Sequence, residues 1–311
     1  MNEIQVFLRQ KLNSPLDISQ PQLVKLPMGN IEYVTYGDGK PVLIIHGGGG
    51  GYDQAVLLFK RYIPEGYQMI CPSRPGYLGT PIDTGHTAEE QADALAGLLD
   101  YLNIPSAVIV AISAGGLSLY PFAIRHPKKT KAIIAIDAIA GEYLMPEQSG
   151  KLAQTLFMTA FGLWLTKKSM IYFPKTFIKN LIKLEGYLDP ARVDDRVKEI
   201  LNCREHLEII AELMYSIADY KARKIGTMND MAEGVKTSWY DFAKISCPAL
   251  IIHGTHDADV KFYNGVFAYE RLASKEKEHF WIEYGTHFGF FFAPQASEAQ
   301  QKFREFIIKH G

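Results

Sequence analysis

The chain has 311 residues, 47% of them hydrophobic, a composition typical of a globular protein that buries a large core. Its 33 basic and 34 acidic side chains nearly balance, so no charge excess indicates nucleic acid or an anionic membrane as a partner. Three scattered cysteines argue against a disulfide framework. The lack of a signal-like N-terminus or a long apolar run predicts a soluble, cytoplasmic protein.

Short β-branched runs alternate with longer amphipathic segments, which predicts a mostly parallel sheet of about eight strands with helices on both faces. Residues 28–30, MGN, lie between the first two runs, so we expect an antiparallel hairpin there. Thr87, with Glu90 three residues later, predicts a capped helix over 87–104, and a last helix is expected over 294–311. The candidate strands are residues 22–26, 31–37, 41–47, 67–73, 107–113, 131–137, 248–254 and 279–285.

The regular alternation stops after the sixth candidate strand and resumes only at the seventh. The residues between them have helical character and no convincing strand. We therefore predict an α/β core formed by residues 1–140 and 246–311, with a helical cap inserted at 141–245. The cap is rich in large apolar side chains, which we expect mainly to pack helix against helix.

The segment AISAG, residues 111–115, joins a predicted strand to a predicted helix. It is close to the G-x-S-x-G nucleophile elbow, in which small residues flank a serine on a strained turn. Ser113 is therefore the candidate nucleophile, and the amide of Ala114 is a candidate donor to a developing oxyanion. Ala111 replaces the first glycine of the motif, a departure that its small side chain makes tolerable.

A serine hydroxyl needs a base to activate it, and the base needs an acid that orients it. Asp257 follows the seventh candidate strand and His287 follows the last, so the chain order is serine, acid, histidine. Asp259, two residues beyond Asp257, is a rival for the acid. Asp137, after the sixth strand, is another, because triad roles depend on geometry more than on chain position.

Five glycines, residues 47–51, follow the third candidate strand and His46. The run fails the G-x-G-x-x-G dinucleotide pattern in every register, and no Gly-Lys-Ser/Thr follows it. A loop at this place contributes the second oxyanion donor in α/β serine hydrolases, and the amide of Gly48, with Gly49 next, is the candidate. His46 is expected to hold this loop through hydrogen bonds.

His253, His256 and Asp257 could suggest a metal site, but no further cluster of ligand-type residues supports one. We therefore expect neither a metal nor a cofactor. The expected partner is a small molecule, with no role for nucleic acid or a membrane.

These segments resemble the α/β-hydrolase superfamily of esterases, lipases and carbon–carbon bond hydrolases, over nearly all of the predicted core. The resemblance implies the α/β-hydrolase fold, with Ser113 as nucleophile, His287 as base and Asp257 as acid. It also implies an oxyanion hole formed by the amides of Gly48 and Ala114.

The implied activity is that of a carboxylesterase acting on a small to medium apolar acyl ester. The glycine loop and the segment CPSRPGYLGTP further resemble a group of bacterial serine hydrolases, and in the superfamily the second segment borders the site. Together with aromatic residues of the cap and the last loop, they supply the candidate substrate-binding residues Gly49, Arg74, Tyr77, Trp164 and Phe288.

Two alternatives remain open. A hydrolase of carbon–carbon bonds in dienoic keto acids also combines a glycine-rich oxyanion loop with a helical cap. It would need a cation for the substrate carboxylate, such as Arg74, Lys167 or Arg223. A receptor or signalling protein that keeps the triad for ligand binding would show little or no multiple turnover.

Overall fold

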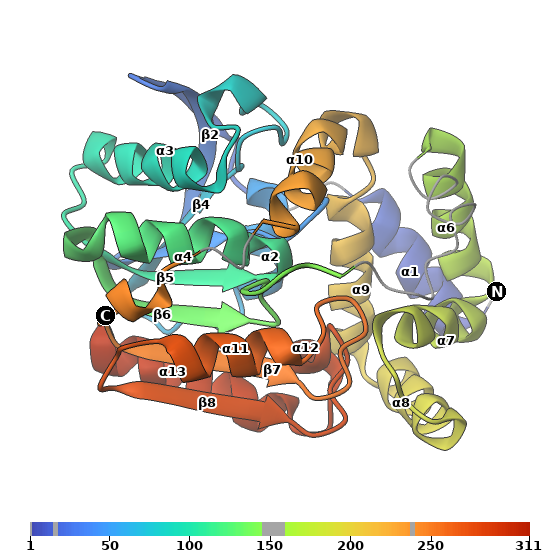
Figure 1. The fold of residues 1–311 in the computed structure, drawn as a ribbon. Coiled ribbons are helices and arrows are strands. Elements are labelled where there is room, and N and C mark those ends of the chain that lie inside the picture. The colour runs from blue at the N-terminus through green and yellow to red at the C-terminus, as the bar shows by residue number, and fades with distance from the viewer. Residues whose placement is uncertain (1, 15–17, 145–158, 237–239) are drawn as a thin grey trace.

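The computed structural model describes residues 2–14, 18–144, 159–236 and 240–311. One sheet runs through this part of the chain, with helices packed on both sides of it (Figure 1). The sheet has eight strands, which confirms the prediction from the alternating pattern. They are β1 (Gln22–Leu26), β2 (Gly29–Tyr36), β3 (Lys40–Ile45), β4 (Tyr67–Pro72), β5 (Ala107–Ile112), β6 (Thr130–Ile136), β7 (Ala249–Gly254) and β8 (Lys277–Ile282).

The strands lie in the order β1-β2-β4-β3-β5-β6-β7-β8. β1 and β2 form the expected antiparallel hairpin, and β2 is antiparallel to β4, whereas all later pairs are parallel. Neighbouring parallel strands end at the same edge of a sheet, so the loops after β3, β5, β6 and β7 meet there. The eighth strand ends at Ile282, earlier than expected, because Tyr284 has a φ of +52° and turns the chain away.

Both faces of the sheet are buried, which explains the uninterrupted aliphatic runs of its central strands. Along β3, Val42 and Ile44 pack on one side while Leu43 and Ile45 pack on the other. The first side is covered by α2 (Tyr52–Phe59), α12 (Gly289–Phe292) and α13 (Ala296–His310). The second side is covered by α3 (Ala88–Tyr101), α4 (Gly116–Arg125) and α11 (Tyr263–Arg271).

The predicted capping box at the start of α3 is present. The Thr87 hydroxyl oxygen accepts the Glu90 N–H at 3.2 Å, and the Glu90 carboxylate accepts the Thr87 N–H at 2.9 Å. The helix ends at Tyr101 rather than 104, because Asn103 adopts a left-handed φ of +56°.

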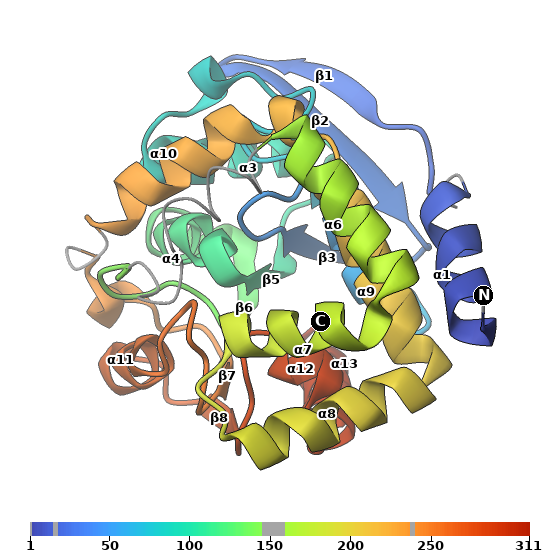
Figure 2. The same cartoon turned by 90° about the vertical axis from the view of Figure 1, so that its right-hand side faces the viewer.

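Between β6 and β7 the described residues form helices and no strand, consistent with the expected cap. These helices lie across the end of the sheet to which the central strands point (Figures 1 and 2). Residues 145–158 and 237–239 of the expected cap lie outside the described residues. The cap helices are α6 (Ala160–Tyr172), α7 (Pro174–Glu185), α8 (Pro190–Asn202), α9 (Arg204–Ser216) and α10 (Lys224–Gly234).

Short 3₁₀ turns connect several elements. They are η1 (Ile82–Thr84), η2 (Ser113–Gly115), η3 (Pro127–Lys129), η4 (Tyr220–Ala222) and η6 (Phe242–Lys244). Among the described residues, every helix is too short or too polar to pass through a lipid bilayer.

The sequence pattern did not predict the N-terminal helix α1 (Glu3–Asn13). Leu8 and Leu12 of this helix are buried, and Ile4 and Phe7 pack beside them, so the helical spacing of its apolar residues was a signal that could have predicted it. The Gln5 side-chain amide donates to the Tyr172 carbonyl at 3.0 Å, at the end of α6. The helix therefore packs as part of the cap although it precedes the sheet in the chain.

Replacing Thr87 by alanine should lower the free energy of unfolding by about 1 kcal/mol, because the Glu90 N–H loses its acceptor. Urea denaturation followed by circular dichroism measures the change. Thr87→Ser keeps the acceptor oxygen and should stay close to the unchanged protein. Equal stabilities for the alanine and serine variants would contradict a capping role.

Candidate active site

Ser113 lies on the turn between β5 and α4, where the elbow motif predicts it. Its φ is +56°, in the left-handed region that is costly for a residue with a side chain. The turn requires glycine at position 115, because a Cβ there would lie 2.7 Å from the Ile45 carbonyl oxygen. Ala111 is fully buried within β5, so the alanine that replaces the first glycine of the motif fits the sheet.

Ser113, His287 and Asp257 form one chain of hydrogen bonds. His287 Nε2 lies 3.0 Å from Ser113 Oγ, and His287 Nδ1 lies 2.8 Å from Asp257 Oδ2. The other Asp257 oxygen accepts the backbone N–H groups of Asp259, at 2.8 Å, and Val260, at 2.9 Å. These bonds hold the carboxylate so that the imidazole presents Nε2 to the serine.

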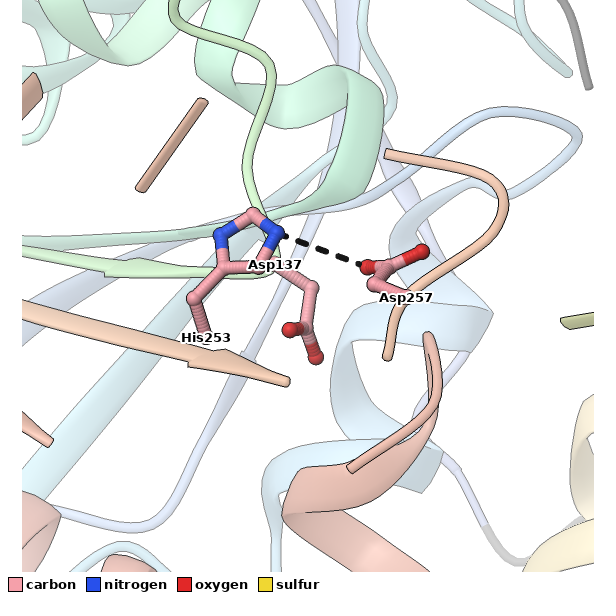
Figure 3. A group of neighbouring side chains, drawn as sticks. All are labelled: Asp137, His253 and Asp257. Carbon is pink, nitrogen blue, oxygen red and sulfur yellow. Dashed lines mark ion pairs between the residues drawn. The ribbon is translucent and has the colours of Figure 1, made fainter. Parts of the chain in front are cut away.

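Asp137, the rival acid, lies beside Asp257 (Figure 3), but the His287 imidazole is hydrogen-bonded to Asp257. Its Oδ1 accepts the Gly254 N–H at 2.8 Å, and its Oδ2 has no partner among the described residues. Burial, and then the charge of Asp257, raises the pKa of Asp137 well above its usual range. This shift favours the protonated form of Asp137, and Asp257 occupies the position next to His287.

His253 completes the group drawn in Figure 3. Its Nε2 donates to the Val260 carbonyl at 2.8 Å and lies 3.6 Å from Asp257 Oδ2, and burial lowers its pKa. Hydrogen bonds thus already engage its Nε2 and both nitrogens of His287. Two groups bring ligand-type atoms within 4.8 Å of one another: Asp137 with His253 and Asp257, and Glu185 with Asp259 and His287. We assign a metal to neither group.

The glycine loop is held by buried polar contacts. The Gly47 N–H donates to Gln54 Oε1 at 3.1 Å, and the Gly47 carbonyl accepts His46 Nδ1–H at 2.7 Å. His46 Nε2 in turn accepts the Arg74 backbone N–H at 2.9 Å. Burial, and then the Arg74 charge, lowers the pKa of His46 well below its usual range, so this neutral histidine fixes the loop as expected.

In the described structure, two backbone N–H groups beside Ser113 are free to donate hydrogen bonds to a bound ligand. The N–H of Gly48 has no acceptor among the described residues, and that of Ala114 lies in the first turn after the elbow, where no intrahelical acceptor exists. A Cβ built on Gly48 would lie 3.7 Å from that of Ala114, so the two are adjacent. Gly49, with a φ of +67°, follows in the same turn and also lines the cavity.

A cavity of about 500 Å³ adjoins these groups, bounded by the glycine loop, Ser113 and His287 on the core side. Phe288 lines it, whereas Phe290 and Phe291 pack into the core around Phe59. The cap contributes a mostly apolar wall, including Leu163, Phe177, Leu181, Leu184, Leu213, Met214, Ile217 and Met231.

Three of the predicted substrate-binding residues do not line the cavity in the described structure. Arg74 is fully buried, and its guanidinium binds both Asp230 oxygens at 2.6 and 2.7 Å. Tyr77 donates its hydroxyl to the same carboxylate. Trp164 lies on the outer side of α6, 53% exposed and stacked on Phe161. Arg74 and Tyr77 therefore join the core to the cap, and Trp164 is a surface residue.

Glu185, which the sequence reasoning missed, lines the cavity at the end of α7. Its Oε2 has no partner among the described residues, and burial, followed by the charge of Asp259, raises its pKa to about 8. One signal was available in the sequence. An acidic residue at the carboxyl end of a helix opposes the helix dipole, so its placement there needs another reason.

The backbone of Glu185 connects the cap to two loops of the site. Its carbonyl accepts the Ala258 N–H at 3.2 Å and the His287 N–H at 3.0 Å. The next residue, Gly186, forms an isolated bridge with Asp257. The end of α7 therefore positions both partners of Ser113.

His287 has an acidic group on each side. Asp257 binds Nδ1, and Asp259 Oδ2 lies 3.4 Å from Nε2, while the Tyr143 hydroxyl donates to Asp259 Oδ1 at 2.7 Å. Burial lowers the pKa of His287, but the charges of Asp257 and Asp259 raise it, and the result lies well above the usual value.

A family model described as "alpha/beta hydrolase fold" matches residues 40–294. The uncharacterized hydrolase YcgS of Bacillus subtilis is 28% identical over 249 residues, which are 78% of this chain and 84% of that protein. A 2-hydroxy-6-oxononadienedioate/2-hydroxy-6-oxononatrienedioate hydrolase of Burkholderia vietnamiensis is 25% identical over 243 residues, 73% of this chain and 74% of that protein. A solved alpha/beta hydrolase fold protein from Nakamurella multipartita, 29% identical, superimposes with a TM-score of 0.87 over 94% of this chain and 100% of that one.

Replacing Asp259 by asparagine should lower the pKa of His287, because the carboxylate that favours the imidazolium is removed while Asp257 stays in place. NMR titration of the histidine ring signals measures this directly. Asp100→Asn, at an exposed side chain paired with Lys129, is the matched control and should leave that titration unchanged. An unaltered pKa in Asp259→Asn would show that the Asp259 charge does not act on His287.

Proposed function

This chain belongs to the alpha/beta hydrolase fold family, and we propose that it is a serine hydrolase that cleaves esters of apolar acyl groups. The observation that carries the proposal is the hydrogen-bonded series Ser113–His287–Asp257 at the wall of an apolar cavity. Serine in such a series becomes a nucleophile, because the histidine can take its proton.

In the proposed mechanism, Ser113 Oγ attacks the ester carbonyl carbon and His287 Nε2 takes the hydroxyl proton. The amides of Gly48 and Ala114 donate to the oxyanion. Collapse of the tetrahedral intermediate breaks the bond to the alcohol oxygen, which receives the proton from His287. Water then attacks the acyl-enzyme, with His287 accepting its proton and returning it to Ser113 as the acid leaves.

Asp257 keeps the Nδ1–H of His287 oriented and stabilises the imidazolium. The raised pKa of His287 means that the imidazole loses its proton at a higher pH than an ordinary histidine does. Since only the neutral imidazole can accept the serine proton, activity is expected to increase as pH rises through that pKa.

Carbon–carbon bond cleavage in a dienoic acid is the second candidate, favoured by the named activity of the Burkholderia relative. The charge of the cavity favours the ester instead. Within the described part of the chain, no lysine or arginine lines the cavity, whereas Glu185, Asp230 and Asp259 do. The candidate cations Arg74 and Arg223 are buried in ion pairs with Asp230 and Asp53. A dicarboxylate substrate would therefore meet no counter-charge there.

Covalent labelling with a fluorophosphonate tests the nucleophile. The unchanged protein should be labelled, and Ser113→Ala should lose both label and turnover of p-nitrophenyl esters, because the attacking oxygen is gone. Turnover of p-nitrophenyl esters with acyl chains of increasing length reports which chain lengths the cavity accommodates. Equal labelling of Ser113→Ala would refute the assignment, and turnover of a dienoic keto acid without turnover of any ester would favour carbon–carbon cleavage.

Gly48→Pro removes the proposed oxyanion N–H and should lower kcat by about 10²- to 10³-fold. Gly48→Ala is the matched control. It keeps the N–H, and its Cβ would only touch that of Ala114 at 3.7 Å, so it should retain most activity. Steady-state kinetics with thermal melting of each variant separates catalysis from folding. Full activity of a folded Gly48→Pro would mean that another group stabilises the oxyanion.

A further inference from the structure

The cap helix α6 is apolar on two sides. On its inner side, Leu163, Met170 and Ile171 are buried. On its outer side and in the turn to α7, the described structure leaves a row of large apolar side chains between 43% and 66% exposed: Phe161, Trp164, Leu165, Tyr172 and Phe173. A second, exposed apolar side on a helix that already buries one is typical of an interaction surface. The outer row, here named the α6 surface, is therefore unusual for a helix that faces water.

The same segment is strongly basic, although the chain as a whole is nearly neutral. Residues 159–184 contain five lysines and neither aspartate nor glutamate. Lys168 lies over the rings of Trp164 and Tyr172, at 5.7 and 5.9 Å from their centroids. Lys179 pairs with Asp194 of α8, whereas Lys168 forms no ion pair within the described residues. The aromatic row thus has a cationic border.

Contrary to the expectation from the nearly balanced charges of the whole chain, we propose that the α6 surface docks the protein on an anionic lipid membrane. Aromatic and aliphatic side chains bordered by lysines are the composition of helices that lie in the membrane interface. The rings would enter the boundary between headgroups and acyl chains, and the lysines would bind lipid phosphates. A second copy of the chain fits less well, because pairing two such surfaces would bring like charges together.

The position of α6 connects this surface to the cavity. Leu163, Thr166 and Ser169 of the same helix line the cavity, so α6 separates the cavity from the α6 surface. Leu184 of α7 lines the cavity and is also 43% exposed. Figure 2 shows α6 and α7 meeting at an angle in front of the sheet. A docked protein would therefore hold the cavity next to the lipid, which suits a membrane-dissolved ester as substrate, an assignment that rests on the proposed hydrolase activity.

Vesicle sedimentation of the full chain tests docking without any need for turnover. Ser113→Ala is used so that no substrate is consumed, with vesicles of phosphatidylcholine alone or containing about 30% phosphatidylglycerol. We expect at least tenfold tighter binding to the anionic vesicles, weakened by salt. Phe161→Ser combined with Phe173→Ser should reduce binding at least tenfold. Lys168→Gln combined with Lys175→Gln, at an exposed lysine in the first turn of α7, should reduce binding and flatten its salt dependence.

Leu23→Ser combined with Ile308→Ser is the matched control. These side chains are 60% and 59% exposed, on β1 and α13, away from the cap, and their loss should leave vesicle binding unchanged. Thermal melting verifies that every variant is folded. Absence of binding, equal binding to neutral vesicles, or unaltered binding of the Phe161/Phe173 variant would overturn the proposal.

A concentration-dependent dimer that the same Phe161/Phe173 change abolishes would also overturn the lipid assignment, because the surface would then bind a second copy. Analytical ultracentrifugation without vesicles detects this outcome. Ester turnover is measured separately on the unchanged protein. Failure of the hydrolase proposal therefore leaves the docking result standing, and failure of docking leaves the hydrolase proposal standing.

Discussion

The parallel strands of the sheet end at one edge, and the position of every proposed active-site group depends on that edge. Ser113 directly follows β5, the loop after β7 carries Asp257, and the loop after β8 carries His287. Beyond the last ladder bonds the backbone needs new partners, because buried N–H groups cannot remain unpaired. The carbonyl of Glu185 supplies one acceptor for both partner loops. The cap is thus part of the site's framework as well as its cover.

Buried ion pairs add a second link between core and cap. Arg74 binds Asp230 of α10, and Arg223 binds Asp53 at the start of α2 and donates to the Gly50 carbonyl at 2.8 Å. Leaving either arginine unpaired in the interior would be costly, so each pair restrains the cap against the glycine loop. The same pairing withdraws both cations from the cavity, whose lining is therefore apolar and acidic, and this supports the neutral ester substrate that we propose.

Charge and hydrophobicity are distributed unevenly over this protein, and the net charge and overall hydrophobic content of the chain do not show this unevenness. A net charge of −1 gives no indication of the basic segment 159–184, because acidic residues elsewhere cancel it. Overall hydrophobic content likewise does not separate the buried side of α6 from its exposed side. Only the position of the helix shows that one apolar face meets the cavity and the other meets the surroundings.

The sequence by itself determined the eight strands, the elbow at Ser113, the capped helix after Thr87 and the chain order of the serine, acid and histidine, because these depend on local periodicity and spacing. Tertiary structure alone decided which acid meets His287. Asp257 and Asp137 both follow strands that end at the same edge, and only the folded chain shows that His287 is bonded to the Asp257 carboxylate. It also decided the roles of Arg74 and Glu185. Asp230, the partner of Arg74, lies 156 residues away in the chain. Glu185 of the cap comes close to His287 only when the chain is folded, so no local pattern could report either contact.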